Sequence, residues 1–307
     1  MSAQNTRVMP YGPEAIAEAA RLIRAGEPVA MPTETVYGLA ADATNGEAVA
    51  RVYAAKGRPG FNPLIVHMLG LDEAAEIAVL GADAERLARA HWPGPLTLVL
   101  PLRNGGPIAS LVTAGLPTVA IRAPAHPAMR DLLTAVGGPL AAPSANASGR
   151  ISPTRVEHVV AHLKGRIPLI VDAGPTVHGL ESTIVALTGG APRLLRPGPI
   201  DLGLALAEEG QVEAPGQLAS HYAPAKPLRL DAERAGPGEW LIGFGGVAGD
   251  ASLSPSGDLV EAAARLFDLL HEAEAGRAPR LAVAPIPKTG LGAAINDRLR
   301  RAAAPRK

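Results

Sequence analysis

Residues 28–38 of the chain are PVAMPTETVYG. The apolar residues 28–31 are typical of a short buried strand, and the hydroxyl-rich residues 32–38 follow them without a break. Open α/β sheets bind their ligands at the ends of strands, where polar turns of this kind lie. We therefore expect residues 28–31 to be a strand of an α/β sheet and residues 32–38 to face a ligand.

Helix-like and strand-like patterns alternate on both sides of this stretch. Apolar residues in Pro13–Arg24 recur at helical spacing after a proline, and Gly26 closes the pattern. Further helices are expected at 47–55, 82–91, 128–135 and 153–163, and further strands at 64–67, 96–100, 118–122, 139–142, 168–172 and 183–187. Interleaving of this density predicts an α/β domain with a twisted mixed sheet over residues 1–210.

The C-terminal third has a different organisation. Residues 211–227 are rich in proline and lack periodicity, which predicts a linker. Strands expected at 228–230, 240–242 and 281–284 and helices at 258–273 and 291–303 predict a small Rossmann-like α/β domain over residues 228–307. Gly243–Ala248 has the glycines of a dinucleotide fingerprint, but no helical pattern follows it, so we expect no cofactor there.

Composition limits the chemistry of the chain. It has 29 basic and 29 acidic residues in 307, so no global field draws it to nucleic acid or to a membrane, and a local cluster must hold any anion. It has no cysteine, which excludes disulfides, thiolate metal sites and cysteine nucleophiles. His158 and His162 lie one helical turn apart without the HExxH pattern, and we expect them on a solvated helix face.

The start of the chain shows no targeting pattern. Residues 1–10 lack a charged head followed by an apolar core, and no apolar run in the sequence approaches the length that spans a membrane. We expect a cytoplasmic protein without a membrane partner.

Short polar motifs at the ends of predicted strands provide a candidate anion cluster. Lys56 offers a compact charge and Arg58 a planar fork, so this pair on a Gly/Pro-shaped loop can hold a polyphosphate from two directions. Ser144 and Asn146 lie in a turn of small residues that can bind anions through side chains and backbone N–H groups. Each motif alone is equally typical of an ordinary surface turn, but together they predict a cationic pocket.

The ordered set of motifs resembles the YrdC-like domain. The set is Pro32–Leu39, Lys56 with Arg58, Trp92–Thr97, Ser144 with Asn146, Glu181–Thr183 and Arg196–Gly198. The linker motif His221–Pro224 and the small domain after it resemble the two-domain form of this family, the threonylcarbamoyl-AMP synthases. The resemblance covers nearly the whole chain. One departure is Ala186, where the family pattern is often acidic.

The resemblance implies an enzyme, a nucleotidyltransferase. It would join L-threonine, bicarbonate and ATP into threonylcarbamoyl-adenylate and release pyrophosphate. Downstream tRNA threonylcarbamoyl-transfer proteins would use the product to form threonylcarbamoyladenosine next to the anticodon. An N-carboxylated threonine is its own nucleophile towards the α-phosphorus, so this reaction needs neither a serine nor a cysteine nucleophile.

The resemblance also implies roles for particular residues. Lys56 and Arg58 would be the catalytic cations at the triphosphate. The residues expected around ATP are Lys56, Arg58, Asn62, Thr118, Ser144, Asn146, Arg196 and Tyr222. The residues expected around L-threonine are Thr35, His67, Arg122 and Ser182, with Arg122 on the α-carboxylate and His67 as either a base or a hydrogen-bonding group. His221 and Tyr222 would form a lid. Magnesium is expected with ATP, held by phosphate oxygens and water, and we name no protein ligand for it.

Two alternatives remain open at this point. An RNA-binding module with weak tRNA contact is suggested by the basic tail Arg298, Arg300, Arg301, Arg306 and Lys307, although neutral overall charge disfavours tight binding. A carbamoyl-transfer relative in the same superfamily is the other. Such proteins usually carry further domains and zinc-binding cysteines. This chain is too short for the further domains and has no cysteine.

Overall fold

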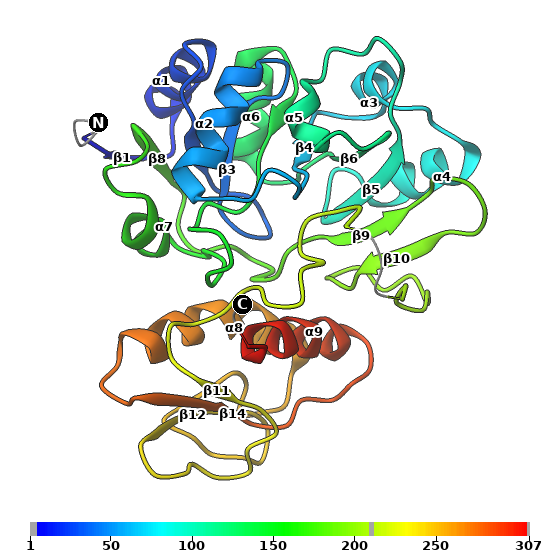
Figure 1. Cartoon of the computed structure of the whole chain (residues 1–307). Helices are drawn as coiled ribbons and strands as arrows, with labels where there is room; N and C mark the ends of the chain where they lie inside the picture. The colour runs from blue at the N-terminus through cyan, green and yellow to red at the C-terminus, as the bar shows by residue number, and fades with distance from the viewer. Residues whose placement is uncertain (1–4, 209–211, 306–307) are drawn as a thin grey trace.

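The computed structural model describes residues 5–208 and 212–305, whose strands form a large and a small sheet (Figure 1). The large sheet has the order β1-β8-β2-β3-β7-β4-β6-β5-β9-β10 and mixes parallel with antiparallel pairs. Its strands are β1 (Arg7–Pro10), β2 (Val29–Met31), β3 (Gly38–Asp42), β4 (Ile65–His67), β5 (Leu96–Pro101), β6 (Thr118–Arg122), β7 (Leu140–Ala141), β8 (Leu169–Asp172), β9 (Thr183–Ala186) and β10 (Arg193–Arg196). The predicted α/β fold with a mixed sheet is confirmed.

Helices cover both faces of the large sheet. They are α1 (Pro13–Arg24), α2 (Gly46–Lys56), α3 (Leu71–Ile77), α4 (Ala82–His91), α5 (Ser110–Thr113), α6 (Pro127–Val136) and α7 (Val156–Leu163). In β2, Val29 and Met31 pack into the apolar cluster that includes α1 and α6, whereas Ala30 packs into the cluster that includes α2 and α4. Burial on both faces explains why residues 28–31 form a continuous apolar run.

The small sheet is entirely parallel, with the order β11-β14-β12-β13. Its elements are β11 (Leu228–Arg229), β12 (Glu239–Gly243), β13 (Ala251–Ser252), α8 (Leu259–Ala275), β14 (Arg280–Val283) and α9 (Leu291–Ala303). After β12 the chain turns back through a Phe244–Val247 bridge into β13 and not into a helix. These residues therefore do not form the strand–turn–helix unit to which a dinucleotide fingerprint belongs.

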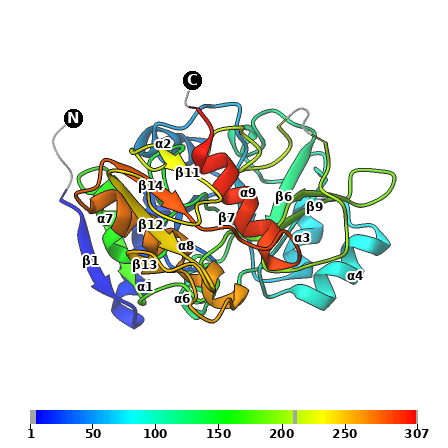
Figure 2. The ribbon, with the colours of Figure 1, turned by 90° about the horizontal axis from the view of Figure 1, so that it is seen from below.

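Helices α8 and α9 lie between the small sheet and the large unit (Figure 1), and Figure 2 shows the small unit lying across the lower face of the molecule. The expectation that His158 and His162 lie on a solvated face is wrong. His158 is buried and its ring stacks on His271 of α8 with centroids 3.8 Å apart, while the His162 ring lies 5.7 Å from the same residue. Packing of α8 against α7 buries His158 and leaves His162 half-buried.

The division of the chain into residues 1–210, 211–227 and 228–307 stays a prediction. Its limits at 1, 210, 211 and 307 lie outside the described residues. Between the two sheets, residues 212–227 form neither helix nor strand. We call residues 212–227 the linker below.

Candidate active site

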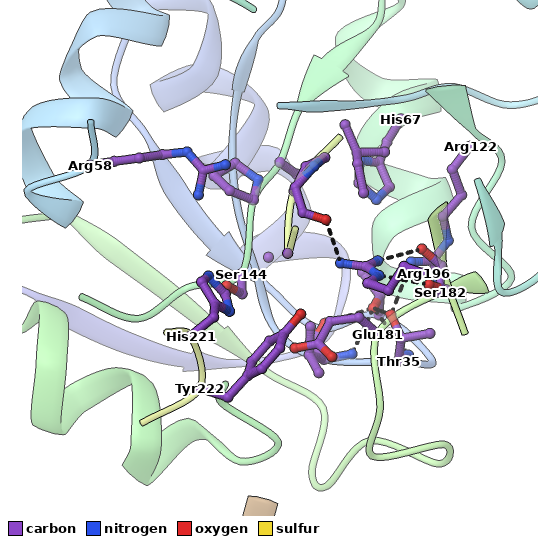
Figure 3. A pocket seen from close by; sticks show the side chains of 18 residues that line it. Thr35, Arg58, His67, Arg122, Ser144, Glu181, Ser182, Arg196, His221 and Tyr222 are labelled. Carbon is purple, nitrogen blue, oxygen red and sulfur yellow. Dashed lines mark hydrogen bonds between the residues drawn. The ribbon is translucent and has the colours of Figure 1, made fainter. Parts of the chain in front are cut away.

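A cavity of about 50 Å³ lies at the ends of several strands of the large sheet and is covered by the linker (Figure 3). Arg58 and Ser144 lie on one side of it, and His67 and Arg122 lie on the other. His221 and Tyr222 reach in from the linker. The structure thus brings residues that are up to 189 positions apart in the sequence, from Thr33 to Tyr222, to one cavity.

The Lys56 and Arg58 motif is joined to the Ser144 and Asn146 motif through the lysine. Asn45 caps the start of α2, and Gly57, in the left-handed conformation with φ of 60°, ends it directly after Lys56. The Lys56 Nζ donates to the carbonyl oxygens of Ser144 and Asn146, each at 2.5 Å. Burial and the nearby Arg58 hold the pKa of Lys56 well below its usual value. Lys56 therefore lies behind the cavity wall and fixes the Ser-Asn turn.

Arg58 lines the cavity and is bound only to backbone oxygens. Its Nε donates to the carbonyl of Asn62 at 3.1 Å, and a terminal nitrogen donates to the carbonyl of Pro63 at 2.8 Å. Burial lowers the pKa of Arg58 to about 10, which leaves it charged at neutral pH. Both side-chain amide atoms of the buried Asn62 lack a hydrogen-bond partner. An uncompensated cation thus lies next to unused polar groups.

Arg122 is held at the end of β6 by residues of two of the motifs, Pro32–Leu39 and Trp92–Thr97. Its guanidinium donates to the carbonyl of Gly94 at 3.2 Å and to the Thr35 hydroxyl at 3.0 Å. It also pairs with Glu34 at 2.5 Å. Burial alone would raise the pKa of Glu34, but the charge and hydrogen bond of Arg122 outweigh it and lower this pKa to about 2. The Arg122 fork is therefore rigid and already has one anionic partner.

His67 and Ser182 complete the side of the cavity around Arg122. Burial, with the charge of Arg122, lowers the pKa of His67 to about 3, so its ring is neutral at neutral pH. The His67 Nδ1 has no hydrogen-bond partner. The Ser182 hydroxyl lies 2.7 Å from the Thr97 hydroxyl and accepts from Arg196 at 3.0 Å. A general base works best when its pKa lies near the working pH, so this low pKa favours a hydrogen-bonding role for His67 over a role as a base.

The linker closes the cavity with two buried rings. Tyr222 has a left-handed backbone with φ of 61°, and its hydroxyl has no hydrogen-bond partner. His221 packs edge-on against it with centroids 4.1 Å apart, and burial lowers the pKa of His221 well below its usual value. A Cβ on Gly216 would lie 2.6 Å from the Tyr222 hydroxyl, so only glycine fits there with this ring in place.

Most of the residues assigned from the sequence come together here. Thr35, Arg58, His67, Arg122, Ser144, Ser182, Arg196, His221 and Tyr222 line the cavity. Lys56, Asn62 and Asn146 are buried without lining it, and Thr118 lies at the far end of β6 from Arg122. The structure does not bring Thr118 to this cavity.

Two buried carboxylates, Glu34 and Glu181, lie beside the arginines of the cavity. Glu34 pairs with Arg122, and Glu181 lines the cavity, accepts from the Ser152 hydroxyl and pairs with Arg298 of α9 at 2.8 Å. The sequence assigned neither of these glutamates to the cavity, and it assigned Arg298 to a basic tail and not to the cavity. A signal was present for Arg298, because it falls on the apolar stripe of α9 formed by Leu291, Ala294 and Ile295.

The basic tail proposed for RNA contact is wrong for two of its members. Arg298 is fully buried, and Arg301 is buried with its Nε 3.1 Å from Asp297. Arg300 is exposed and pairs with the same carboxylate at 2.9 Å. Arg306 and Lys307 lie outside the described residues. These ion pairs replace the basic surface that the sequence suggested.

Within residues 5–208 and 212–305, no group of three histidine, cysteine, aspartate or glutamate residues is placed to hold a metal ion. Glu34 and Glu181 are both engaged by arginines. In the same residues, no helix is long and apolar enough to cross a membrane. The cytoplasmic location stays a prediction.

The fold and the cavity define a YrdC-like protein with a second, smaller α/β unit. The family described as "Telomere recombination" matches residues 21–198, and "Threonylcarbamoyl-AMP synthase, C-terminal domain" matches residues 182–304. The threonylcarbamoyl-AMP synthase of Bacillus subtilis is 39% identical, over 94% of this chain and 92% of the relative. That of Pyrococcus abyssi is also 39% identical, over 92% of each.

A solved structure agrees with these sequence comparisons. The crystal structure of P. abyssi Sua5 complexed with L-threonine matches with a TM-score of 0.89 and 35% identity, over 97% of both chains. The chain therefore belongs to the threonylcarbamoyl-AMP synthase family, and its activity is that of a nucleotidyltransferase. The family and the fold class predicted from the sequence are confirmed.

Proposed function

We propose that the protein joins L-threonine, bicarbonate and ATP into threonylcarbamoyl-adenylate and releases pyrophosphate, with the cavity under the linker as its active site. The observation that carries this proposal is the arrangement of arginines around one cavity, with Arg122 on one side and Arg58 on the other. Two separated cationic groups suit an amino-acid carboxylate and a nucleotide triphosphate bound next to each other.

The side of the cavity around Arg122 would bind threonine. The Arg122 fork would hold the α-carboxylate, with the hydroxyls of Thr35 and Ser182 and the free Nδ1 of His67 around the rest of the molecule. A second positive charge is unfavourable beside a buried arginine. This environment favours the neutral amine of threonine, which is the form that can be carboxylated by bicarbonate.

The side around Arg58 would bind MgATP. Arg58, Ser144 and Arg196 line the cavity and would contact the phosphates, with Asn62, Asn146 and Tyr222 around the remainder of the nucleotide. Lys56 would reach the triphosphate by exchanging one carbonyl partner for a phosphate oxygen. Because Glu34 and Glu181 are both engaged by arginines, magnesium would take its ligands from phosphate and water.

The chemical step needs positioning and charge stabilisation more than a protein nucleophile. A carbamate oxygen of N-carboxythreonine attacks the α-phosphorus, and the bond from that phosphorus to the pyrophosphate oxygen breaks. Negative charge moves to the leaving pyrophosphate, where Arg58 and Arg196 would stabilise it. The adenylate would then pass to proteins that transfer the threonylcarbamoyl group to tRNA.

The linker would act as a lid. A cavity of about 50 Å³ has room for a few water molecules but not for a nucleotide, so the linker has to lift before ATP can enter. The product is a mixed anhydride, and closure of His221 and Tyr222 over it would exclude water.

Pyrophosphate release from MgATP, measured with threonine, bicarbonate, both or neither, tests this function. We expect release only when both co-substrates are present. Release that ignores threonine would refute the proposal. Salt-sensitive RNA binding without nucleotide turnover would favour the RNA-binding alternative.

A further inference from the structure

We propose that Arg298 of α9 is a positioning residue of the active site that latches Tyr222 over the cavity and holds Glu181 in the cavity wall. In this account the small-sheet unit does more than carry the linker, because it provides the side chain that keeps the lid closed. The proposal rests on the proposed function for its effect on the reaction, but the latch itself can be measured without turnover.

The first support is the set of groups that Arg298 contacts. Its Nε donates to Glu181 at 2.8 Å, and a terminal nitrogen donates to the carbonyl of Pro197 at 3.0 Å. Its guanidinium carbon lies 5.3 Å from the centre of the Tyr222 ring, within the range of a cation–π contact. Arg298 is fully buried in this position. One side chain from the small unit thus joins two parts of the large unit to the lid.

The contacted groups adjoin residues with proposed substrate roles. Glu181 lines the cavity and precedes Ser182 in the chain, while Pro197 follows Arg196. Arg196 in turn donates to the Ser182 hydroxyl at 3.0 Å and to the Pro215 carbonyl of the linker at 3.3 Å. A shift of Arg298 would therefore reach both the wall and the cover of the cavity.

The second support is that the linker is bound along α9. Arg301 donates to the carbonyl of Leu218 at 2.8 Å. The backbone N–H of His221 donates to the carbonyl of Arg301 at 3.2 Å, and the Ser220 hydroxyl donates to that of Ala304 at 3.4 Å. Because these bonds attach the lid to the end of α9, the lid and the helix move together. Opening then requires the Arg298–Glu181 pair to separate.

The design of the test follows from the burial of this pair. Removal of one partner of a buried ion pair leaves an uncompensated charge and can prevent folding. Arg298→Lys keeps the charge but loses the fork that spans Glu181 and Pro197. A double variant, Arg298→Met with Glu181→Gln, removes both charges together. Asp297 keeps its other partners, Arg300 and Arg301, in both cases.

The experiment is hydrogen exchange of the linker amides in the full-length protein without substrates, followed by the ratio of free AMP to adenylate during turnover. We expect Arg298→Lys and the double variant to exchange about tenfold faster than the parent around residues 218–223, as expected for loss of a charge-assisted hydrogen bond. We also expect the AMP fraction to rise. Arg86→Gln is the control, since it removes an exposed ion pair with Asp83 on α4, outside α9 and the linker.

Unchanged linker exchange in the two Arg298 variants, with a lowered melting temperature, would overturn the latch and leave Arg298 a merely structural residue. Unchanged exchange with an unchanged melting temperature would overturn it as well. Failure of the parent protein to release pyrophosphate would refute the proposed function instead, and the exchange result would still decide the latch.

Discussion

At the scale of single residues, the cavity arginines differ in how their charge is compensated. Arg58 donates to two backbone carbonyls, which accept from two of its N–H groups but leave its positive charge in place. Arg122 donates to a carbonyl as well but also pairs with Glu34. A protein with equal numbers of acidic and basic residues can thus keep a cationic site at Arg58, because carbonyl partners do not neutralise it.

This difference predicts that the stability and the activity of an Arg58→Gln variant diverge. A buried cation without an anionic partner opposes folding, so its removal should leave the melting temperature unchanged or raise it. Loss of the charge next to the leaving pyrophosphate should lower kcat/KM for ATP by about a hundredfold or more. Thermal unfolding and steady-state pyrophosphate release measure the two effects.

Arg193→Gln is a suitable control for this variant, because it removes an exposed ion pair with Glu213 outside the cavity. A fall in the melting temperature of Arg58→Gln in step with its activity would indicate a structural role and contradict the prediction.

At the scale of elements, the sequence predicted the ends of a helix correctly where local capping residues mark those ends. The Asn45 cap and Gly57 bound α2 and place Lys56 on its last turn. Expected helix 153–163 begins only at Val156, because the Pro153 carbonyl accepts from the Tyr37 N–H at 2.8 Å. Such long-range bonds have no local signal in sequence. The same holds for β3, which follows the 32–37 turn directly and owes its strand form to pairing with β2.

The sequence did not predict the interface of α7 and α8, because the residues that meet there are about a hundred positions apart and leave no local signal. His158 accepts from the Thr154 N–H at 3.2 Å through Nδ1 and has Asp268 3.5 Å from its Nε2, while His271 lies 3.2 Å from the Ser152 carbonyl. Arg155 also pairs with Asp268 at 2.7 Å. His162 and Glu274 are the remaining titratable neighbours of this histidine pair.

This interface predicts loss of stability in mild acid. Burial lowers the pKa of His158 to about 4, while burial and the charge of His158 lower the pKa of His271 to about 3. Unfolded histidine has a pKa of about 6.5, so the unfolded state binds protons first. The stabilisation is complete above pH about 6.5 and falls towards pH 4, by at most about 1.4 kcal/mol per pH unit for each histidine.

Denaturant unfolding between pH 7.5 and 5 would measure this loss. His271→Phe keeps a ring against His158 but cannot be protonated, so its free energy of unfolding should fall less steeply below pH 6.5 than that of the parent. Equal slopes for the two proteins would contradict the prediction.

At the scale of the whole molecule, the chain joins a large unit that forms the cavity walls to a small unit that carries its cover. The sequence predicted the motifs of the walls, because each is a short continuous stretch at a strand end. It did not predict Glu181 with Arg298, because the two are 117 residues apart and meet only after the small unit has docked. The linker lies between the units and contacts both.

The closed lid predicts the behaviour of Tyr222→Ala. Tyr222 is buried against the cavity, and its loss should leave the fold intact but admit water to the adenylate. We expect a larger share of turnovers to end as free AMP at saturating ATP, measured by chromatography of quenched reactions. Tyr11→Ala, at an exposed position between β1 and α1, serves as control. Equal hydrolysis of the intermediate by variant and parent would argue against a lid.

The central claim is that one cavity assembles threonine, bicarbonate and the adenylyl group into a single molecule. Its most direct test is mass spectrometry of a quenched reaction that contains ¹³C-labelled bicarbonate, L-threonine and MgATP. The account predicts an adenylate that contains threonine and one labelled carbon, formed in equal amount to pyrophosphate. Pyrophosphate formed without an adenylate that carries both threonine and the label would contradict it.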